Sequence, residues 1–519
     1  MMYLPAIVSV VALAWLCLYP VIRYHLDPKK LKTFPAPSVA AYTPLWGMYY
    51  TWKGNQWKMI EKAHAKLGSA VRIAPNHISF TDPAAYKDIY GFGNNILKDD
   101  FYAHIGAGNP SMAQTTDKAA HSTKRRYLAH VFSAKEVVAM EPRVMELVHK
   151  LCEKLRIKAD GCKVGPDDEY ETVKGVVDIQ PWLNMLTYDA ITSMFFTNSY
   201  GFLDRGNDLC PSLDDSGKVD MVHGMDTFHS ASGFNTMLAP LPLPLYRLGR
   251  KLLAYSHGCR AGSWFLGMSR YQVTHRLENE PSQPDLFSRF PSKPTEKKPI
   301  PMPVSEMIAE CATMLDAGND TTQTSLTMCI YHLAKYPQVQ KKLFRELSKE
   351  IRPEYATTRV LPSQIVQNVP YLRAVLDENW RCRPPVTRGL PRRTVAGGAT
   401  IAGHFIPEGT TISAPTYNLH HNHELFRQAD EFIPERWIAT ESFGADEMER
   451  QNLKDFVIPF SLGPRACIGR NLAYMEISIT IAALVLNFEF ELADEHQEIE
   501  TIERFNCNPA GLILKISPR

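Results

Sequence analysis

A single cysteine near the C-terminus lies in a tightly specified stretch of backbone. FSLGPRACIGR, residues 460–470, places Cys467 among two glycines, a proline and two arginines, directly before a run with helical spacing. A helix that begins near Ile468 would aim free backbone N–H groups and the positive end of its dipole at the thiol. Both stabilise a thiolate, so the sequence predicts a metal ligand or a nucleophile at Cys467.

The neighbours of Cys467 favour a metal held in a flat macrocycle. Gly463 and Gly469 would let the backbone approach a flat, bulky group. Arg465 can pair with a carboxylate of that group. Haem fits this description, because a cysteine thiolate is one of the axial ligands of haem iron.

These residues carry a resemblance. The stretch is similar to the haem-binding signature Phe-x-x-Gly-x-Arg-x-Cys-x-Gly of the cytochrome P450 family, through Phe460, Gly463, Arg465, Cys467 and Gly469. The chain looks most like the microsomal fungal members. The resemblance implies haem b as cofactor, with Cys467 as the ligand of the iron and the other four residues as part of the haem-binding loop.

Two further motifs support the resemblance by their order. ENWR, residues 378–381, resembles the Glu-x-x-Arg motif of the family, and PERW, residues 434–437, resembles the motif whose arginine joins that pair. By resemblance, Glu378, Arg381 and Arg436 form a buried triad with a structural role beneath the haem. An isolated Glu-x-x-Arg is otherwise an ordinary ion pair on a helix surface.

A long helical pattern over Val304–Tyr336, with Ser305 as its expected N-cap, is interrupted by AGNDTT, residues 317–322. Glycine, asparagine, aspartate and threonine are poor residues for the centre of a helix. The alternative is a helix end at Gly318. A rule broken in mid-element often marks a functional site.

The interrupted stretch resembles the oxygen-activating part of the family's long helix. The resemblance implies that Asp320 and Thr321 form an acid–alcohol pair that delivers protons during catalysis. It also implies that Ala317 and Gly318 leave room for O2 beside the cofactor.

The haem propionates have three candidate partners. In HSTKR, residues 121–125, His121 stands where many family members carry tryptophan, and Arg125 occupies the arginine position. Arg392 is the third candidate, with Arg388 as its competitor. An exposed basic helix face is the alternative for residues 121–125.

The resemblance implies a monooxygenase that inserts one oxygen atom from O2 by hydroxylation, epoxidation or multistep oxidation. Neither GFGNNI (91–96) nor GAGNPS (106–111) completes a dinucleotide-binding motif. A separate NADPH–cytochrome P450 reductase is therefore implied as electron donor. Basic residues could form its docking surface, although such runs are usually solvated helix faces: Lys124, Arg126, Lys341, Lys342 and Arg345.

The expected substrate is a lipophilic small molecule of the terpenoid or polyketide type, in secondary metabolite biosynthesis. By resemblance, the substrate-lining segments are largely apolar: Phe101–Met112, Phe228–Met237, Ala309–Ala317, Val386–Leu390 and Pro509–Leu512. The apolar loop 239–245 either dips into a bilayer or is a packed surface turn.

The elements that must hold these residues are mostly helical. Apolar spacing predicts helices over Lys118–Val131, Lys135–Leu155, Trp182–Thr197, Val304–Tyr336 and Val339–Ile351. Strands are predicted in Ala70–Phe80 and Thr394–Ala414, with turns at 397–398 and 408–409. Residues 281–303 hold seven prolines and are expected to form an exposed loop. We expect a mainly α monomer with small β-sheets, the cytochrome P450 fold with its triangular helical prism.

The first segment predicts a membrane anchor. Residues 1–22 carry no charge, and the nineteen from Leu4 to Ile22 would span about 28 Å as a helix, close to the thickness of a hydrocarbon layer. Basic residues at 23, 29, 30 and 32 place the following chain in the cytosol. We expect a single-pass anchor in the endoplasmic reticulum membrane (1–22), a basic, proline-rich tether (23–40) and a cytosolic catalytic domain (41–519). A cleaved signal peptide is the alternative.

Composition excludes other classes. The net charge of +2 argues against nucleic-acid binding, and ten scattered cysteines without a C-x-x-C pair indicate a reducing compartment. The alternatives are a haem-thiolate isomerase or dehydratase acting on peroxides without a reductase, a cysteine hydrolase, and a non-catalytic haem sensor. Histidines 420, 421 and 423 resemble a zinc site, but no ligand cluster accompanies them, and a loop is expected.

Overall fold

The structure is a computed structural model that describes residues 18–106, 110–290, 301–438 and 453–519. Helices make up most of it, as the sequence predicts. Their bounds are α2 (Leu45–Trp52), α3 (Gln56–Leu67), α4 (Pro83–Tyr90), α5 (Phe101–Ile105), α6 (Lys118–Val131), α7 (Ala134–Ala159), α8 (Ile179–Phe196), α9 (Phe202–Arg205), α10 (Gly224–Leu238), α11 (Leu243–Leu252), α12 (His257–Glu278), α13 (Val304–Lys335), α14 (Pro337–Ser348), α15 (Ser363–Val366), α16 (Pro370–Cys382), α17 (Thr416–His420) and α19 (Arg470–Asn487).

The strands are short. They are β1 (Ala70–Ala74), β2 (His77–Phe80), β3 (Ile96–Lys98), β4 (Val176–Asp178), β5 (Leu209–Leu213), β6 (Val219–His223), β7 (Arg392–Thr394), β8 (Ala399–Ile401), β9 (His404–Ile406), β10 (Thr411–Ser413), β11 (Phe488–Leu492), β12 (Thr501–Glu503), β13 (Cys507–Pro509) and β14 (Ile513–Pro518). The largest sheet has the order β1-β2-β10-β7-β3, and a second has β11-β14-β4. Three two-stranded pairs, among them β12–β13, complete the sheets of the described residues.

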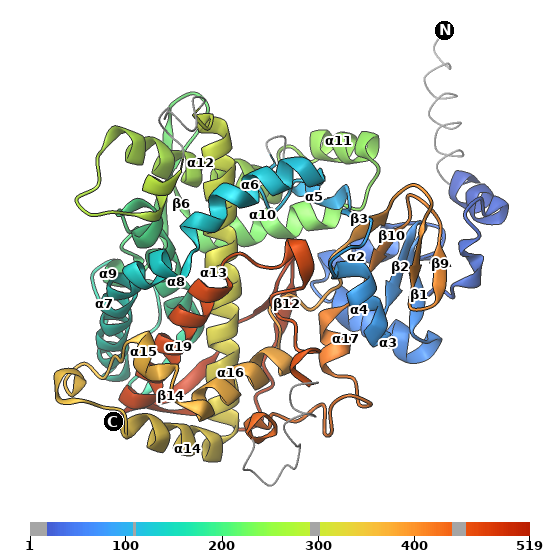
Figure 1. The fold of residues 1–519 in the computed structure, drawn as a ribbon. Helices are drawn as coiled ribbons and strands as arrows, with labels where there is room; N and C mark the ends of the chain where they lie inside the picture. Colours follow the sequence, from blue (N-terminus) through green and yellow to red (C-terminus); the bar gives the residue numbers. More distant parts are fainter. Residues whose placement is uncertain (1–17, 107–109, 291–300, 439–452) are drawn as a thin grey trace.

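Helix α13 runs through the middle of the molecule (Figure 1). Helices α7, α8 and α19 lie on one side of it, and the sheet that contains β1, β2 and β10 lies on the other side with α2, α3 and α4. Single-turn 3-10 helices fill several connections: η1 (Leu31–Thr33), η2 (Leu286–Arg289), η3 (Pro353–Tyr355), η4 (Pro434–Trp437) and η5 (Gly463–Arg465). The α13 helix can therefore present side chains to both halves of the fold.

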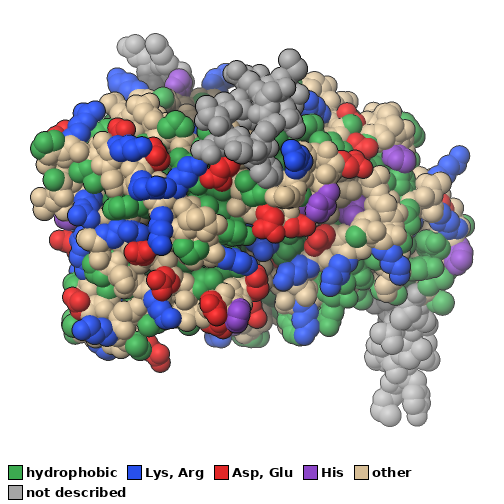
Figure 2. Space-filling model, turned by 90° about the horizontal axis from the view of Figure 1, so that it is seen from below, with side chains coloured by type: hydrophobic (Ala, Val, Ile, Leu, Met, Phe, Trp, Pro, Cys, Tyr) green, Lys and Arg blue, Asp and Glu red, His purple; other side chains and the backbone are tan. Residues whose placement is uncertain are grey.

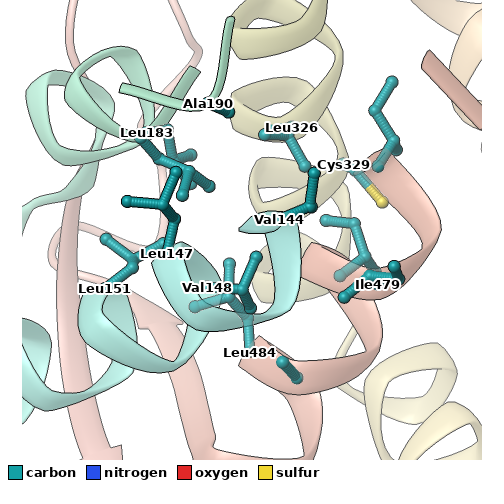
Figure 3. Packing of buried hydrophobic residues seen from close by; sticks show 14 of the residues in the cluster. Val144, Leu147, Val148, Leu151, Leu183, Ala190, Leu326, Cys329, Ile479 and Leu484 are labelled. Atoms are coloured by element: carbon teal, nitrogen blue, oxygen red, sulfur yellow. The ribbon is translucent and has the colours of Figure 1, made fainter. Parts of the chain in front are cut away.

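The main hydrophobic core forms where four helices meet (Figure 3). Apolar residues of α7, α8, α13 and α19 interdigitate there, among them Val144, Leu183, Leu326 and Leu484, all fully buried. Burying such side chains contributes about 1.5–3 kcal/mol each relative to exposure. This core fixes α13 and α19, the helices on which the sequence places the oxygen-activating stretch and the cysteine loop.

The predicted helices agree with the structure to within a few residues, and α6 has the predicted bounds. One detail of the longest helix differs from the prediction, because Pro303, not Ser305, occupies its N-cap. The helix continues unbroken through Gly318 to Lys335, which confirms the predicted range and excludes the alternative of a helix end at Gly318. Almost every residue after Thr321 in α13 is buried, so tertiary burial outweighs the poor helix propensity of the AGNDTT stretch.

The predicted strand regions hold, but the turns were only partly placed. A hairpin joins β8 and β9 through Ala402 and Gly403, both with positive φ. Gly397 and Gly398 instead precede β8, and Gly409 lies just before β10. Sequence patterns identified the glycines with special backbone conformations but not the strands that each one joins.

Most of the predicted anchor, residues 1–17, lies outside the described residues. Residues 18–26 are helical, and no helix within the described ranges is long and apolar enough to cross a membrane. The predicted tether is not a free linker. Leu31, Phe34 and Ala40 are buried, and Lys29 Nζ donates to Asn76 Oδ1 at 2.9 Å and to Gly409 O at 2.7 Å. The folded body therefore begins before residue 41.

The proline-rich segment is also only partly a surface loop. Residues 291–300 lie outside the described part of the chain, but Leu286, Phe287, Phe290 and Met302 on either side are buried. Elsewhere, positive and negative side chains are mixed over the face in Figure 2. That distribution agrees with the small net charge and gives no large field of one sign on this face.

Candidate active site

The cysteine loop is built by η5 and the start of α19. The N–H of Cys467 donates to Phe460 O at 2.9 Å, which closes the loop. Helix α19 begins at Arg470 with Gly469 as its N-cap, two residues later than the expected start. Burial raises the pKa of the Cys467 thiol, while the Gly469 backbone N–H, Arg125 and Arg470 lower it. Desolvation dominates, so the protein alone does not favour the thiolate as predicted, and a bound cation would be needed to deprotonate the sulfur.

Cys467 differs from the other interior cysteines. Its side chain is accessible, although enough protein surrounds it for burial to raise its pKa. Most of the other described cysteines are fully enclosed: Cys152, Cys210, Cys311, Cys329, Cys382 and Cys507. The Cys467 sulfur is therefore both accessible and partly desolvated, so a bound group could reach it.

The glycines of the loop have distinct roles. Gly463 has φ +67°, and an added Cβ would lie 2.2 Å from Tyr90 O, so close contact with α4 excludes a side chain. The structure thus explains Gly463 by backbone contact within the protein, which the sequence did not reveal. A Cβ on Gly469 would lie 3.9 Å from the Cys467 sulfur, beside the accessible thiol. Phe460 packs edge-on against Trp380 at 5.4 Å between ring centroids.

Basic side chains gather near the loop, and no carboxylate of the described residues forms an ion pair with them. Arg125 Nη1 donates to Ala466 O at 2.9 Å, and Arg465 Nη1 donates to Thr115 O at 2.8 Å. Burial, followed by Arg392, lowers the pKa of Arg465 to about 10, with Arg125 a weaker cause. Burial, then Arg465 and Arg125, lowers the pKa of His121 to about 3. The predicted propionate partners are therefore close enough to repel one another.

The sequence did not identify a fifth member of this group. Lys98, at the end of β3, donates to Ala113 O and lies 3.9 Å above the Tyr102 ring. Burial, Arg392 and Arg465 hold its pKa well below the usual range. A lysine at the end of a three-residue strand carries no sequence signal of its own. Arg388, the competitor of Arg392, instead pairs with Gln56 at 2.6 Å and faces Glu503.

These observations test the fit of haem. An accessible, desolvated thiol needs a cation to ionise it, and crowded cations need anions to offset their repulsion. An iron porphyrin with two propionates supplies both. The residues present therefore fit the group, with Cys467 for the iron and Lys98, His121, Arg125, Arg392 and Arg465 for the propionates.

Helix α13 carries the predicted oxygen-activating residues. Thr321 Oγ1 donates to Ala317 O at 2.8 Å, and both residues are accessible in a stretch of helix that is otherwise largely buried. Gly318 has a different role from the one predicted. An added Cβ there would lie 2.6 Å from Ile191 Cδ1, so this glycine allows α8 to approach α13.

Asp320 is buried and fully occupied as an acceptor. Its oxygens accept from Asn506 Nδ2 and Asn508 Nδ2 at 2.7 Å each, His229 Nε2 at 3.2 Å and Gln323 Nε2 at 3.3 Å. His229 and the two asparagines lower the pKa of Asp320 and outweigh burial, which raises it. Thr321 is not among these partners. The two residues of the predicted acid–alcohol pair are therefore adjacent in sequence, but their side chains do not form a hydrogen bond with each other.

The predicted triad is assembled in the structure. Glu378 accepts from Arg381 Nη2 at 2.9 Å and from Arg436 Nε at 2.9 Å, and all three side chains are buried. Trp437 Nε1 donates to Glu378 Oε2 at 2.9 Å. Arg381 also reaches the backbone oxygen of Ala429 at 2.6 Å, so the triad ties α16 to the segment before η4.

The structure also bears on the predicted docking surface and on the predicted histidine loop. Lys124 points inward and pairs with Glu310 at 3.0 Å and with Glu306, so it does not belong to an exposed docking surface. His420 is buried, with Nδ1 3.1 Å from Trp380 O and Nε2 accepting from Ile458 N at 3.0 Å. Both ring nitrogens are thus used in holding the loop, which accounts for this histidine without zinc.

The fold and the site together define a haem-thiolate oxidoreductase. A family model described as Cytochrome P450 matches residues 37–518. The chain therefore belongs to the cytochrome P450 family, whose cofactor is haem b, and it is a monooxygenase of that family.

Known relatives cover nearly the whole chain. It is similar to the cytochrome P450 monooxygenase poxM of Penicillium oxalicum, 29% identical over 93% of this chain and 89% of the relative. It is also similar to the benzoate 4-monooxygenase bphA of Aspergillus niger, 32% identical over 96% of this chain and 95% of the relative. A third relative is the cytochrome P450 monooxygenase ORF9 of Penicillium roqueforti, 30% identical over 96% and 90%.

Proposed function

We propose that this monooxygenase inserts one oxygen atom from O2 into a lipophilic small molecule in secondary metabolism. The observation that carries the proposal is the accessible Cys467 thiol beside a cluster of unbalanced cations. The relatives named as monooxygenases support the reaction class. The electrons come from a separate NADPH–cytochrome P450 reductase, and the chain acts as a monomer.

Each residue of the site has a separate role in the proposed reaction. Bound haem would supply the reductive activation of O2. Cys467 would hold the iron, and Arg125, Arg392 and Arg465 would hold the propionates through charge-assisted hydrogen bonds. Thr321 holds a proton on Oγ1 at an accessible position of α13. Asp320 orients the elements around it, since as a proton donor it would first have to release its present donors.

We place the chain at the endoplasmic reticulum membrane with its catalytic domain in the cytosol. The uncharged segment 1–22 supports a single-pass anchor. Helix α11 supports a second contact, because apolar side chains are exposed on and beside it: Leu243, Leu245, Leu248, Leu252 and Leu253. Arg247, Arg250 and Lys251 on the same helix suit an anionic surface. Part of the predicted loop 239–245 thus belongs to a helix.

We propose that the reductase docks on those of the predicted basic residues that remain exposed. Arg126, Lys341 and Arg345 are exposed, whereas Lys342 is half-buried and lies 3.2 Å from Glu435. Exposed cations steer an acidic partner and raise the association rate more than the affinity.

A spectrum and a reconstitution test the proposal. The reduced protein with carbon monoxide is expected to show the red-shifted Soret band of thiolate-ligated haem. Turnover of a lipophilic substrate should then require both reductase and NADPH. If the protein instead converts an organic peroxide without reductase, and does not oxidise the lipophilic substrate with reductase and NADPH, it is an isomerase or dehydratase.

A further inference from the structure

The accessible positions of α13 are confined to its middle. Between Cys311 and Ala334, the accessible residues are Ala312, Thr313, Asp316, Ala317, Gly318 and Thr321. Gly318 is explained by its contact with Ile191 of α8. At 100° per residue, Asp316 and Thr321 lie about 140° apart around α13, at the two ends of an arc that also holds Thr313, Ala317 and the buried Asp320. Asp316 and the proposed catalytic hydroxyl therefore belong to the same accessible stretch of α13, at its opposite edges.

The polar side chains in this part of α13 differ in their number of hydrogen-bond partners. Thr313 Oγ1 donates to Ser111 Oγ at 2.7 Å, and Thr321 Oγ1 donates to its own helix. Asp320, one turn from Asp316, accepts from four donors on α10, α13 and the β12–β13 pair. Within the described chain, no hydrogen bond or ion pair reaches the Asp316 carboxyl.

This difference separates the two carboxyls chemically. Burial, with Asp320 as a second cause, raises the pKa of Asp316 to about 8. The charged groups that reach this turn of the helix act on Asp320. His229 of α10 bonds Asp320, and Arg504 of the β12–β13 turn donates to Asn508 Oδ1 at 3.2 Å, facing Asp320 and Asp226.

A desolvated carboxyl without a partner is costly, and such groups in clefts are characteristic of binding sites. An anionic ligand would be repelled by Asp320 and would depend on the proton of Asp316. A cation would be attracted by both carboxyls and would allow Asp316 to ionise. The segments that the family resemblance assigns to the substrate lining are largely apolar, so the complementary ligand is a lipophilic molecule with one positive centre.

We propose that Asp316 is the polar anchor of the substrate pocket and that it binds the cationic nitrogen of a lipophilic amine. This inference rests on the proposed function, since it places the substrate against the accessible stretch of α13 that also carries Thr321. It narrows the substrate class from lipophilic molecules in general to those with a basic nitrogen.

A matched pair of probes tests it. (3-Phenylpropyl)trimethylammonium cannot coordinate iron, and (4,4-dimethylpentyl)benzene is its neutral carbon isostere. The shift of the Soret band and calorimetry would measure the affinity of the haem-loaded protein for each. We expect Asp316→Asn to weaken ammonium binding at least tenfold and to change isostere binding less than twofold. Asp226→Asn, which removes an exposed charge of α10, should leave both affinities within twofold.

The wild-type protein provides a test without any variant. The probe carries no titratable proton, and it must displace the proton of Asp316 below pH 8. Its affinity should therefore fall about tenfold per pH unit below about 8, whereas that of the isostere should stay constant. Absence of ammonium binding, an affinity independent of pH, or an equal effect of Asp316→Asn on both probes would overturn the proposal. The carbon monoxide spectrum and NADPH-dependent turnover test the proposed function separately.

Discussion

Asp320 and Asn508 lie 188 residues apart in the chain, yet the Asn508 amide nitrogen is 2.7 Å from Asp320 Oδ1. Asn506 binds the other oxygen at the same distance, and His229 of α10 and Gln323 of α13 also donate to this carboxylate. A single carboxylate of α13 thus holds two elements that flank the proposed substrate pocket. In a low-dielectric interior, such a network is strong when complete and costly when broken.

The Asn508→Asp variant tests this link. It replaces a donor by a second carboxylate of the same shape, so like charges should push the β12–β13 pair away from α13. We expect faster amide hydrogen exchange in 501–509 and in α10, with the thiolate haem spectrum retained. Arg504→Lys, which keeps the charge at the turn, is the control. Unchanged exchange in Asn508→Asp would show that the link does not hold the pair in place.

The Thr321→Ala variant tests the proposed proton position. It removes the hydroxyl on the accessible face of α13 but keeps the helix, because alanine is the best helix former. We expect a normal carbon monoxide spectrum and a smaller share of NADPH electrons recovered in product, with the rest released as hydrogen peroxide. Thr321→Ser should restore most of the coupling. Equal coupling in wild type and Thr321→Ala would assign the proton to another group.

The Cys467→Ala variant tests the metal ligand. It removes the accessible sulfur, so the thiolate Soret band should disappear while far-ultraviolet circular dichroism stays near that of the wild type. Cys259→Ala is the matched control, because that thiol is half-buried and remote in sequence. A red-shifted band in Cys467→Ala would contradict the ligand assignment.

Local signals in the sequence were enough to predict the elements and the motif residues. The apolar spacing of 118–131 predicted α6 to the residue, and Glu378, Arg381 and Arg436 meet as the resemblance implied. What the sequence could not show depends on contacts between distant segments. Gly463 faces the backbone of Tyr90, Lys124 turns inward to Glu310, and Gly318 admits Ile191.

The same limit explains the two aspartates of α13. Asp316 and Asp320 are the same residue type and lie one helical turn apart in α13. The sequence pointed to Asp320 only through its place in a motif. Their different environments arise because Asn506, Asn508 and His229 reach one of them and no described residue reaches the other. Residues 186 and 188 positions away decide the chemistry, and no local pattern encodes that.

The buried triad predicts a large stability effect. Arg436→Met should leave Glu378 with one guanidinium fewer in a fully buried site, at a cost of about 3–5 kcal/mol in the free energy of unfolding. Lys349→Met breaks the exposed pair with Glu346 and should cost less than about 1 kcal/mol. Urea unfolding followed by fluorescence measures both. Equal losses would show that burial does not set the strength of these pairs.

Buried histidines predict how stability depends on pH. The ring of His332 lies 2.9 Å from Asn379 Oδ1 and stacks on Phe432, and burial lowers its pKa to about 3. Below pH 6.5 the unfolded chain therefore takes up a proton that the folded protein refuses, so stability falls as the pH is lowered towards 3. His332→Gln should make the loss between pH 6 and 4 shallower by about 1.4 kcal/mol per pH unit. His496→Gln, at an exposed position, should leave the slope unchanged, and a slope equal in all three proteins would mean that His332 is protonated in the folded state.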